Sequence, residues 1–229
     1  MVAFGSKDGH LYAVNRETRK RVFKTAVTTI EKPTKAPTAD GVHSCPGPVG
    51  GVEWNGPAYD EKTRQLVVGA VDWCAVIKSD KVDFQPGKFL VAGSWIWDDK
   101  RSGWISALDP DSGALRWQYH AEAPVVAGIT PTAGGVTFGG DMSGNFIALD
   151  SKTGAVLHKV ATGGAVAGGI ITYALGGRQY VAIDSGNVSR LSFGENGKPS
   201  VVIYALPEGA ASDGKAVSAL SPERRVYTV

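Results

Sequence analysis

The chain has 229 residues, with 24 lysines and arginines against 22 aspartates and glutamates, for a formal net charge of +2. Its basic and acidic residues are interspersed, which excludes the positive patch that nucleic-acid-binding proteins use, so we expect no nucleic-acid partner. It also has no apolar run of about 18 residues, the length that a membrane-spanning helix needs. Its 30 glycines and 12 prolines, with runs rich in valine, isoleucine and tyrosine, are typical of many short strands joined by tight turns.

Four copies of one pattern recur along the chain. Each opens with alanine, has aspartate or asparagine two residues later, serine or threonine at the fifth following position and a bulky residue at the tenth. The copies begin at Ala13, Ala58, Ala107 and Ala148, so they are 41 to 49 residues apart. A period of roughly 40 to 50 residues is typical of β-propeller blades. The sequence therefore predicts an all-β fold of four to five four-stranded antiparallel blades. These would form either a small closed ring or, as the divergence of the copies favours, an arc of a larger one.

Within each copy the pattern predicts a strand, a turn and a second strand. A glycine turn precedes three of the copies, in DGHLYA, SGWISA and SGNFIA, and apolar residues then alternate as in a half-buried strand. The aspartate and the serine or threonine that follow can hydrogen-bond the local backbone, and glycine closes that bend. Arg19 and Arg64 replace this glycine in two copies, so we expect their turns to differ from the others.

The SKDGHLYAVNR opening and five later stretches together resemble the C-terminal half of the pyrroloquinoline quinone (PQQ)-dependent alcohol dehydrogenases. The stretches are GPVGGVEWNGPAYDEKT (47–63), VVGAVDWC (67–74), PGKFLVAG (86–93), VVAGITPTAGGVTFGGDMSGNFIALDSKTG (125–154) and GRQYVAIDSGN (177–187). They keep the family's order and spacing, and the resemblance covers residues 2 to 205. It implies an eight-bladed propeller, periplasmic or secreted, that holds PQQ and Ca²⁺ near its central axis. This chain would supply about half of that propeller.

The resemblance assigns four residues to cofactor binding. Lys7 matches a lysine or arginine placed against the quinone carbonyls, where a cation stabilises negative charge, although a solvated turn lysine is the alternative. Glu53 and Trp54 match a pair that is Asn-Trp in many relatives, and Trp54 also fits an ordinary blade tryptophan. Glu53 adds a negative charge, which disfavours an anionic cofactor unless Glu53 is protonated or paired with a cation. Asn187 matches a backbone approach to the cofactor, with a plain turn as the alternative.

Other parts of the family's site are expected outside this chain. The catalytic aspartate, the tryptophan floor beneath the quinone, the Ca²⁺ carboxylate and the adjacent-cysteine ring belong, by the resemblance, to blades upstream of Met1. We therefore assign no catalytic and no metal-binding residue here. Val126 stands where methanol-oxidising relatives have tryptophan, which implies a wider pocket. The four histidines show no metal-ligand spacing; they are His10, His43, His120 and His158. His158 stands at the bulky position of its repeat copy, so we expect it to be a packing residue. GGAVAGG (163–169) lacks the helix of a dinucleotide site, so we expect a strand-edge loop.

The resemblance also pairs Cys45 with Cys74. They are the only cysteines, they lie 29 positions apart, and the family joins the same two segments by a cystine. Such a bridge stabilises a fold by about 3 to 4 kcal/mol in the chain-entropy model. Two buried free thiols are the alternative.

Two functions of different class remain open. The first is part of a quinoprotein dehydrogenase that oxidises an alcohol to an aldehyde with PQQ and passes electrons to an acceptor such as cytochrome c. The second is a non-catalytic propeller that serves as a scaffold or binding module. Met1 opens directly into a strand–turn–strand pattern with no signal peptide, so we expect the chain to start inside a blade. An open arc exposes apolar faces, so we expect self-association or a partner half, and no alcohol oxidation by the chain alone.

The composition changes after residue 206. We expect residues 1–206 to form the partial propeller and residues 207–229 to form a linker or tail, rich in alanine, serine and glycine. Its end, ERRVYTV, resembles the opening helix of the haem c domain that follows the propeller in some relatives, although the chain holds no C-x-x-C-H motif. A disordered terminus is the alternative.

Overall fold

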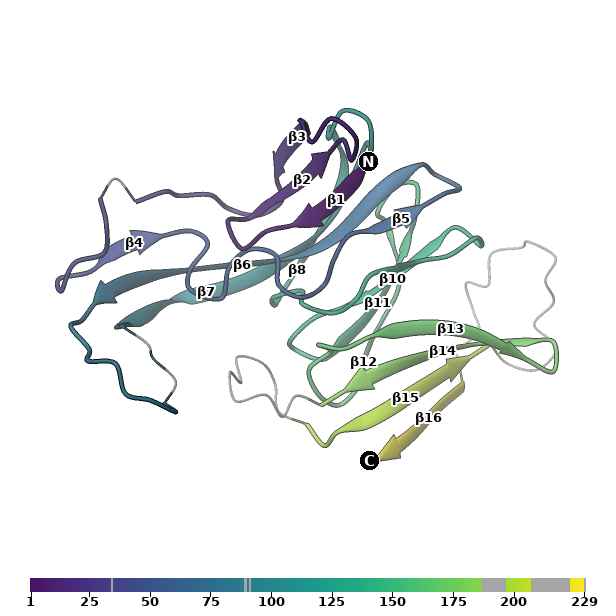
Figure 1. Cartoon of the computed structure of the whole chain (residues 1–229). Helices are drawn as coiled ribbons and strands as arrows, with labels where there is room; N and C mark the ends of the chain where they lie inside the picture. The colour runs from purple at the N-terminus through teal and green to yellow at the C-terminus, as the bar shows by residue number, and fades with distance from the viewer. Residues whose placement is uncertain (34, 89, 91, 187–196, 207–222, 229) are drawn as a thin grey trace.

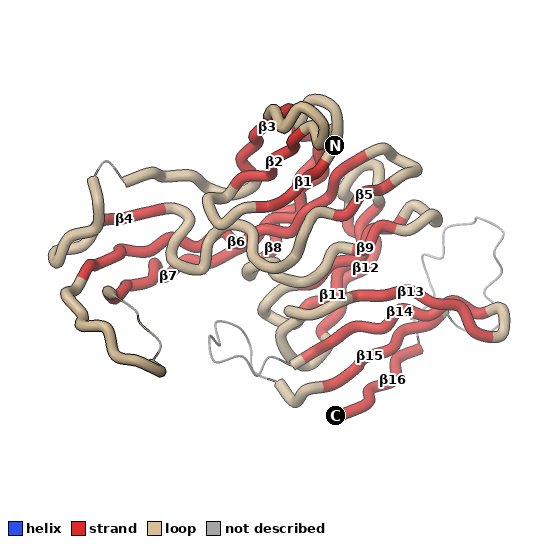
Figure 2. The backbone as a smooth tube through the Cα atoms, in the orientation of Figure 1, coloured by secondary structure: helices blue, strands red, loops and turns tan. Residues whose placement is uncertain are grey.

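The computed structural model describes residues 1–229 except 34, 89, 91, 187–196, 207–222 and 229. The described residues form strands and loops without a helix (Figure 2), as the abundance of glycine, valine and isoleucine predicts. In that part of the chain we find no helix long and apolar enough to cross a membrane.

The strands form four antiparallel sheets that follow one another along the chain (Figure 1). The first sheet contains β1 (Val2–Gly5), β2 (His10–Val14) and β3 (Arg21–Ala26). The second has the order β4-β6-β7-β8, with β5 also paired to β6; its strands are β4 (Val42–Ser44), β5 (Ala58–Asp60), β6 (Gln65–Ser79), β7 (Gly93–Leu108) and β8 (Leu115–Ala121). The third contains β9 (Thr130–Pro131), β10 (Val136–Gly140), β11 (Asn145–Asp150) and β12 (Val156–Ala161). The fourth contains β13 (Ile170–Leu175), β14 (Arg178–Ser185), β15 (Ser200–Ala205) and β16 (Glu223–Thr228). The predicted all-β arc of blades is confirmed.

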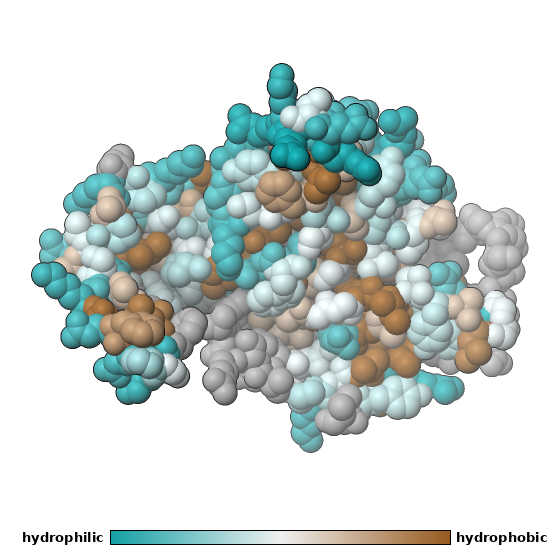
Figure 3. All heavy atoms as spheres, in the orientation of Figure 1, coloured by the Kyte–Doolittle hydropathy of each residue, from teal (hydrophilic) through white to brown (hydrophobic). Residues whose placement is uncertain are grey.

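Each neighbouring pair of sheets shares an apolar core. Leu11 of the first sheet packs with Val68 and Leu108 of the second, and all three are fully buried. The second and third sheets meet at a further cluster, and the third and fourth sheets at another. The two terminal sheets keep apolar residues on the surface: Val2, Phe4, Ile171, Tyr173 and Leu175 are all more than a third exposed. Figure 3 shows hydrophobic side chains gathered over β13 and β14.

Three of the four sequence copies occupy equivalent places in the sheets. Ala13, Ala107 and Ala148 each lie opposite the bulky residue that comes ten positions later, and each is followed by a β-bulge. The opposing residues are Phe23, Trp117 and His158. The small alanine leaves room for the ring on the facing strand, which explains why the two residue types recur together. His158 thus takes the register position expected for a packing residue.

The copy that begins at Ala58 is not equivalent to the others. It forms the turn from β5 to β6, whereas the others connect the last two strands of their sheets. Ala58 lies opposite Val67 and no bulge follows it. The pattern therefore marks a type of turn, and its even spacing of 41 to 49 residues does not measure the blade length here.

The prediction that the turns closed by arginine differ from those closed by glycine is wrong. Arg19 and Arg64 have φ angles of 58° and 52°, close to the 73° of Gly113 and Gly154. The reason is the side chain at the start of the turn. In the first copy the Asn15 carboxamide oxygen accepts hydrogen bonds from the backbone N–H groups of Glu17 and Thr18, at 3.0 and 2.9 Å. In the other copies a carboxylate oxygen accepts from the residues two and three positions later in the same way; the residues are Asp60, Asp109 and Asp150. These hydrogen bonds fix the turn whichever residue closes it.

The glycine turn expected at Gly103 is also absent. Gly103 lies within β7, opposite Val71 and Ala121, and β6 and β7 run on as a hairpin of 15 and 16 residues. A Cβ atom added to Gly103 would lie 2.7 Å from the backbone oxygen of Ala123, so glycine is needed for close approach. Cys45 is joined to Cys74 of β6 by a disulfide with a Cα–Cα separation of 4.5 Å, which confirms the predicted bridge.

The end of the chain departs from the expected tail. Residues 223–228, which resemble an opening helix in their sequence, form β16 and pair along β15. They complete the fourth sheet, since β15 would otherwise be its edge. Residues 207–222 lie outside the described residues.

Candidate cofactor-binding site

One loop, residues 47–55, carries two of the predicted site residues and lies between the first and second sheets. Its backbone at Gly51 donates to Lys7 O at 3.0 Å and accepts from Val71 N at 2.7 Å. Val52 N donates to Ser6 O at 3.2 Å. The loop is thereby tied both to the β1–β2 turn and to β6. A side chain at Gly51 would strike the backbone of Gly9, so the two segments approach closely only because both are glycine.

This arrangement brings Lys7 and Glu53 into direct contact. Lys7 Nζ lies 2.7 Å from Glu53 Oε1 and also donates to Val49 O at 2.7 Å. The Glu53 side chain is only 8% exposed, whereas that of Lys7 is 66% exposed. The negative charge that Glu53 adds is therefore paired with a cation, which is one of the two conditions under which a glutamate can stand beside an anionic ligand. An ammonium group has three N–H donors, and these two contacts use two of them.

Trp54, the next residue, reaches across to a different sheet. Its indole Nε1 donates to Ala167 O at 3.1 Å, and the residue is 60% exposed. Ala167 belongs to the loop between β12 and β13, so the indole links the β4–β5 loop of the second sheet to the loop that joins the third sheet to the fourth. An exposed indole with its N–H already satisfied offers a flat apolar face to a ligand.

The GGAVAGG segment is the strand-edge loop that was expected. It connects β12 to β13, donates from Val166 N to Asp141 O at 3.0 Å and accepts from Gly186 N at Ala165 O, also at 3.0 Å. Gly168 of this loop lies against the side chain of Asp184: a Cβ atom placed on Gly168 would be 2.8 Å from the Cβ atom of Asp184. Asn187, the fourth predicted site residue, lies outside the described residues.

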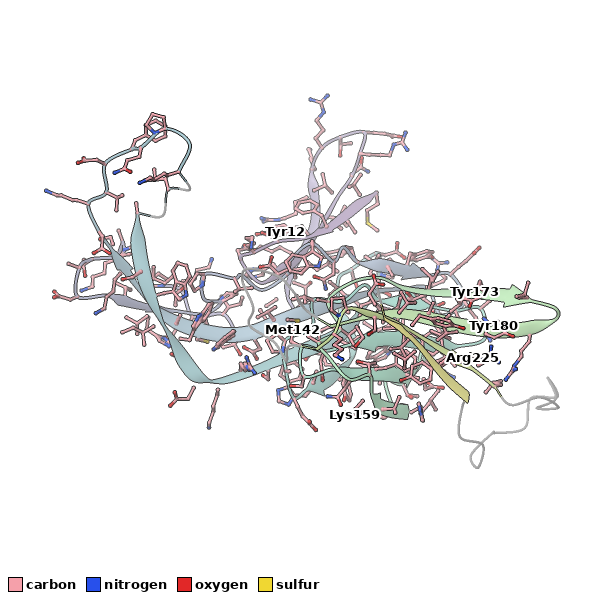
Figure 4. The ribbon with its side chains drawn as sticks, turned by 90° about the horizontal axis from the view of Figure 1, so that it is seen from below. Tyr12, Met142, Lys159, Tyr173, Tyr180 and Arg225 are labelled. Carbon is pink, nitrogen blue, oxygen red and sulfur yellow. A yellow bond between two sulfur atoms is a disulfide. The ribbon has the colours of Figure 1, made fainter. Side chains whose placement is uncertain are left out.

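Below these loops lies an apolar cluster formed by β6 and by the β8–β9, β10–β11 and β12–β13 loops. It contains Val71, Trp73, Val126, Met142 and Ala165, with Val49 and Ala167 packed against it. Met142 stands near the centre of the molecule in Figure 4. Val126 is fully buried in this cluster, so its side chain does not line an open pocket in this structure. The loops that hold Lys7 and Trp54 in place therefore rest on a buried apolar base.

Sequence reasoning missed a row of tryptophans on the long hairpin. Trp73 of β6 and Trp97 of β7 stack with ring centroids 4.0 Å apart, and Trp95 meets Trp97 edge-on at 6.2 Å. The Arg101 guanidinium also lies over the Trp73 ring, 5.6 Å from its centroid. The alternation in Trp95-Ile96-Trp97 was the available signal, since residues two apart on a strand share a face.

A cavity of about 700 Å³ lies elsewhere, at the rim between the second and third sheets. Its lining includes Lys62, Arg116, Asp150 and Lys152 and contains none of the predicted site residues. Arg116 is committed to Asp109, whose pKa it holds below the usual range. Convergence of the predicted residues, and not cavity size, therefore decides where the candidate site lies.

Several known proteins share sequence with this chain. A family model of PQQ-type repeats, described as outer membrane protein assembly factor BamB, matches residues 101–219. The quinoprotein ethanol dehydrogenase of Pseudomonas aeruginosa is 34% identical over 142 residues, which are 60% of this chain and 23% of that protein. The lanthanide-dependent methanol dehydrogenase of Methylacidiphilum fumariolicum is 31% identical over 178 residues, which are 73% of this chain and 29% of that protein.

A solved structure shows the same likeness. The europium-containing methanol dehydrogenase matches 79% of this chain and 35% of its own, with a TM-score of 0.70 and 26% sequence identity. The chain spans about a quarter of the length of the curated relatives named above. The chain therefore belongs to the family of PQQ-type β-propellers, and it is similar to part of the quinoprotein alcohol dehydrogenases.

Proposed function

We propose that this chain forms one wall of the PQQ site of a quinoprotein dehydrogenase that oxidises an alcohol to an aldehyde. The observation that carries the proposal is the contact between Lys7 and Glu53 beside the exposed Trp54. Three residues matched to the family by sequence alone lie on two loops that contact each other. A chance resemblance would not require them to converge.

The chemistry of these residues suits an anionic quinone. PQQ, when bound, supplies an oxidant that accepts a hydride from the alcohol carbon. Lys7 keeps an exposed ammonium group with a further N–H donor, which can stabilise negative charge on the ring oxygens. The Trp54 indole offers a face on which a planar ring can stack. The Ca²⁺ that accompanies PQQ in the family is assigned to residues of other blades, so no metal ligand is proposed for this site.

The same proposal limits what the chain does alone. The family's general base is expected in other blades, and a positioned base contributes roughly 10² to 10⁴ in rate. The substrate, a small alcohol, and the acceptor, such as cytochrome c, therefore belong to the complete enzyme in the periplasm. This chain is proposed to need a partner half of the propeller.

Two observations favour the alternative of a non-catalytic scaffold or binding module. Glu53 neutralises the cation that would face the cofactor. The family model that matches residues 101–219 is also described as an assembly factor and not as an enzyme. A scaffold would keep the blades and bind no quinone.

Equilibrium dialysis of PQQ against the purified chain separates the two functions. We expect weak, saturable binding by the wild type and a loss of about tenfold in affinity for Lys7→Met, since one charged contact contributes on the order of 1.4 kcal/mol. Lys20→Met removes an exposed lysine in another turn and serves as the matched control. Equal affinity in the two variants would overturn the assignment of Lys7, and no binding by the wild type would favour the scaffold.

An activity assay accompanies the dialysis. With added PQQ and Ca²⁺ we expect no measurable dye-linked oxidation of ethanol by this chain. Turnover under those conditions would show that the catalytic residues lie within its 229 positions.

A further inference from the structure

A second cluster of reactive side chains lies at the disulfide and contains neither Lys7 nor Glu53. Glu31 and Cys45 form an isolated antiparallel β-bridge, with N–H···O distances of 2.8 and 3.0 Å. Directly opposite residues in such a pair point to the same side. His43 lies two positions before Cys45 and shares that side. One potential ligand atom from each residue lies within 4.8 Å of the other two.

The spacing of these atoms fits a tetrahedral metal ion. Ligand distances of about 2.0 to 2.3 Å for zinc place two such ligand atoms about 3.3 Å apart for N and O, and about 3.5 Å apart for S and O. His43 Nδ1 lies 3.2 Å from Glu31 Oε2, and Cys45 Sγ lies 3.7 Å from the same oxygen. Imidazole, carboxylate and thiolate are the three ligand types that zinc takes in proteins.

Asp98 is not one of the three potential ligands, but its carboxylate contacts the imidazole of His43. Its Oδ2 lies 3.0 Å from His43 Nε2, on the opposite side of the imidazole from Glu31. A zinc-bound histidine usually donates its other ring N–H to a carboxylate, which fixes the tautomer and aims the coordinating nitrogen at the metal. Here Asp98 holds Nε2, and Nδ1 is the nitrogen that faces Glu31. This carboxylate–histidine pairing is the second feature of a metal site, independent of the ligand spacing.

The disulfide decides whether the third ligand is available. Cys45 is bonded to Cys74, and a disulfide sulfur is not a thiolate. We propose that reduction of this bridge converts Glu31, His43 and Cys45 into a zinc site. A dithiol supplies two electrons and two protons and becomes a cyclic disulfide, the S–S bond breaks to give two thiols, and Cys45 then loses its proton as its sulfur binds the metal.

Access to the site comes from the solvent side. The Glu31 and His43 side chains are 60% and 37% exposed, whereas Cys45 is 4% exposed. A metal ion can therefore reach the carboxylate and imidazole first and the thiolate last. Three protein ligands leave the fourth position for water, the pattern of an open zinc site.

The test uses Co²⁺ as an optical probe, followed by Zn²⁺ as the competitor. In Cys74→Ser, Cys45 is a free thiol without any reductant. We expect equimolar Co²⁺ binding with a sulfur-to-cobalt charge-transfer absorption, and loss of that absorption on addition of Zn²⁺. Cys45→Ser also holds one free cysteine but lacks the ligand, so we expect no such absorption. The oxidised wild type should show none and should have no reactive thiol.

Two further variants test the geometry. In the Cys74→Ser background, His43→Gln should abolish the absorption, and Asp98→Asn should weaken Co²⁺ affinity about 10- to 100-fold while the absorption remains. Circular dichroism checks that each variant folds. If Cys74→Ser does not fold, the wild type reduced with a phosphine replaces it.

Folded Cys74→Ser, or folded reduced wild type, that binds Co²⁺ no better than Cys45→Ser would overturn the proposal. So would an absorption that survives His43→Gln.

Discussion

Trp117 of the second sheet lies against the backbone of Gly154 in the third: a Cβ atom placed on Gly154 would be 2.6 Å from the Cε3 atom of the indole. The indole Nε1 also donates to Ser151 O, in the same turn, at 3.1 Å. Phe23 makes the corresponding contact with Gly113 between the first and second sheets. The repeat therefore encodes the junction between sheets, since the bulky residue of one sheet fits against the turn glycine of the following sheet.

Replacement of that glycine should break the junction. Gly154→Ala introduces a methyl group against the indole at a φ of 73°, so overpacking and left-handed backbone strain act together. We expect a loss of about 2 to 4 kcal/mol in the free energy of unfolding, measured by urea titration. Gly176→Ala is the matched control, with a φ of 60° and no atom within 4 Å of the new Cβ. It should cost only about 1 kcal/mol, and equal losses would refute the contact as the cause.

In the turns closed by arginine, we expect a substitution to raise the free energy of unfolding. Arg19 holds a φ of 58°, a conformation that glycine adopts without strain. Arg19→Gly should raise the free energy of unfolding by about 0.5 to 1 kcal/mol, because relief of strain exceeds the entropy that glycine adds to the unfolded chain. Arg19→Ala keeps a Cβ atom and should bring no gain. A lower stability for Arg19→Gly would mean that the arginine makes an interaction stronger than the strain.

Asp141 gives a pH-dependent prediction. It is fully buried between β10 and β11, and burial raises the pKa of its carboxyl group despite hydrogen bonds from Asn145 and Ser143. The folded state then holds the proton more tightly than the unfolded state, so this group's contribution to stability falls as the pH rises through and above 3.8. Asp141→Asn removes the titration. We expect the wild type to lose stability relative to Asp141→Asn as the pH rises above 3.8 in urea titrations, and a difference that stays constant with pH would contradict the raised pKa.

The terminal sheets predict association in solution. Ile171 and Leu175 on β13 are 60% and 68% exposed, and Tyr173 between them stacks on Tyr180 at 5.2 Å, as Figure 4 shows. We expect light scattering at tens of micromolar to give masses above that of the monomer. Ile171→Thr with Leu175→Lys should shift the distribution towards the monomer, since the apolar face shrinks. A monodisperse wild-type monomer would argue strongly against an open arc.

The sequence predicts the arc of blades better than it predicts where individual turns and strands lie. The alanine and the bulky residue of each copy face each other across a strand pair, so the copies at Ala13, Ala107 and Ala148 mark real blade positions. The copy at Ala58 does not mark an equivalent position, because a D-x-x-T bend stabilises its turn wherever it stands in a sheet. The turn predicted at Gly103 is absent because glycine serves close backbone approach as well as turns, and local sequence does not distinguish the two.

The candidate site is predicted in part for a related reason. Lys7 and Glu53 come to notice through family resemblance, but their ion pair depends on how the loop that carries Glu53 lies against the β1–β2 turn. Contacts between segments more than 40 residues apart arise from tertiary packing, which no local pattern encodes. The same holds for Glu31 and Cys45, whose β-bridge brings together ligand types that look unrelated in the sequence.

The affinity of Glu53→Asn for PQQ tests the central claim most directly. If Lys7, Glu53 and Trp54 face the cofactor, removal of the buried carboxylate frees the Lys7 ammonium group and removes repulsion of an anionic ligand. Equilibrium dialysis should then show PQQ bound roughly tenfold more tightly than by the wild type, a change of about 1.4 kcal/mol. Glu61→Asn makes the same charge change in the β5–β6 turn and should leave the affinity unchanged, and Lys7→Met should cancel the gain in Glu53→Asn. An affinity of Glu53→Asn equal to or weaker than that of the wild type, with the protein folded, would contradict the assignment of this site to the quinone.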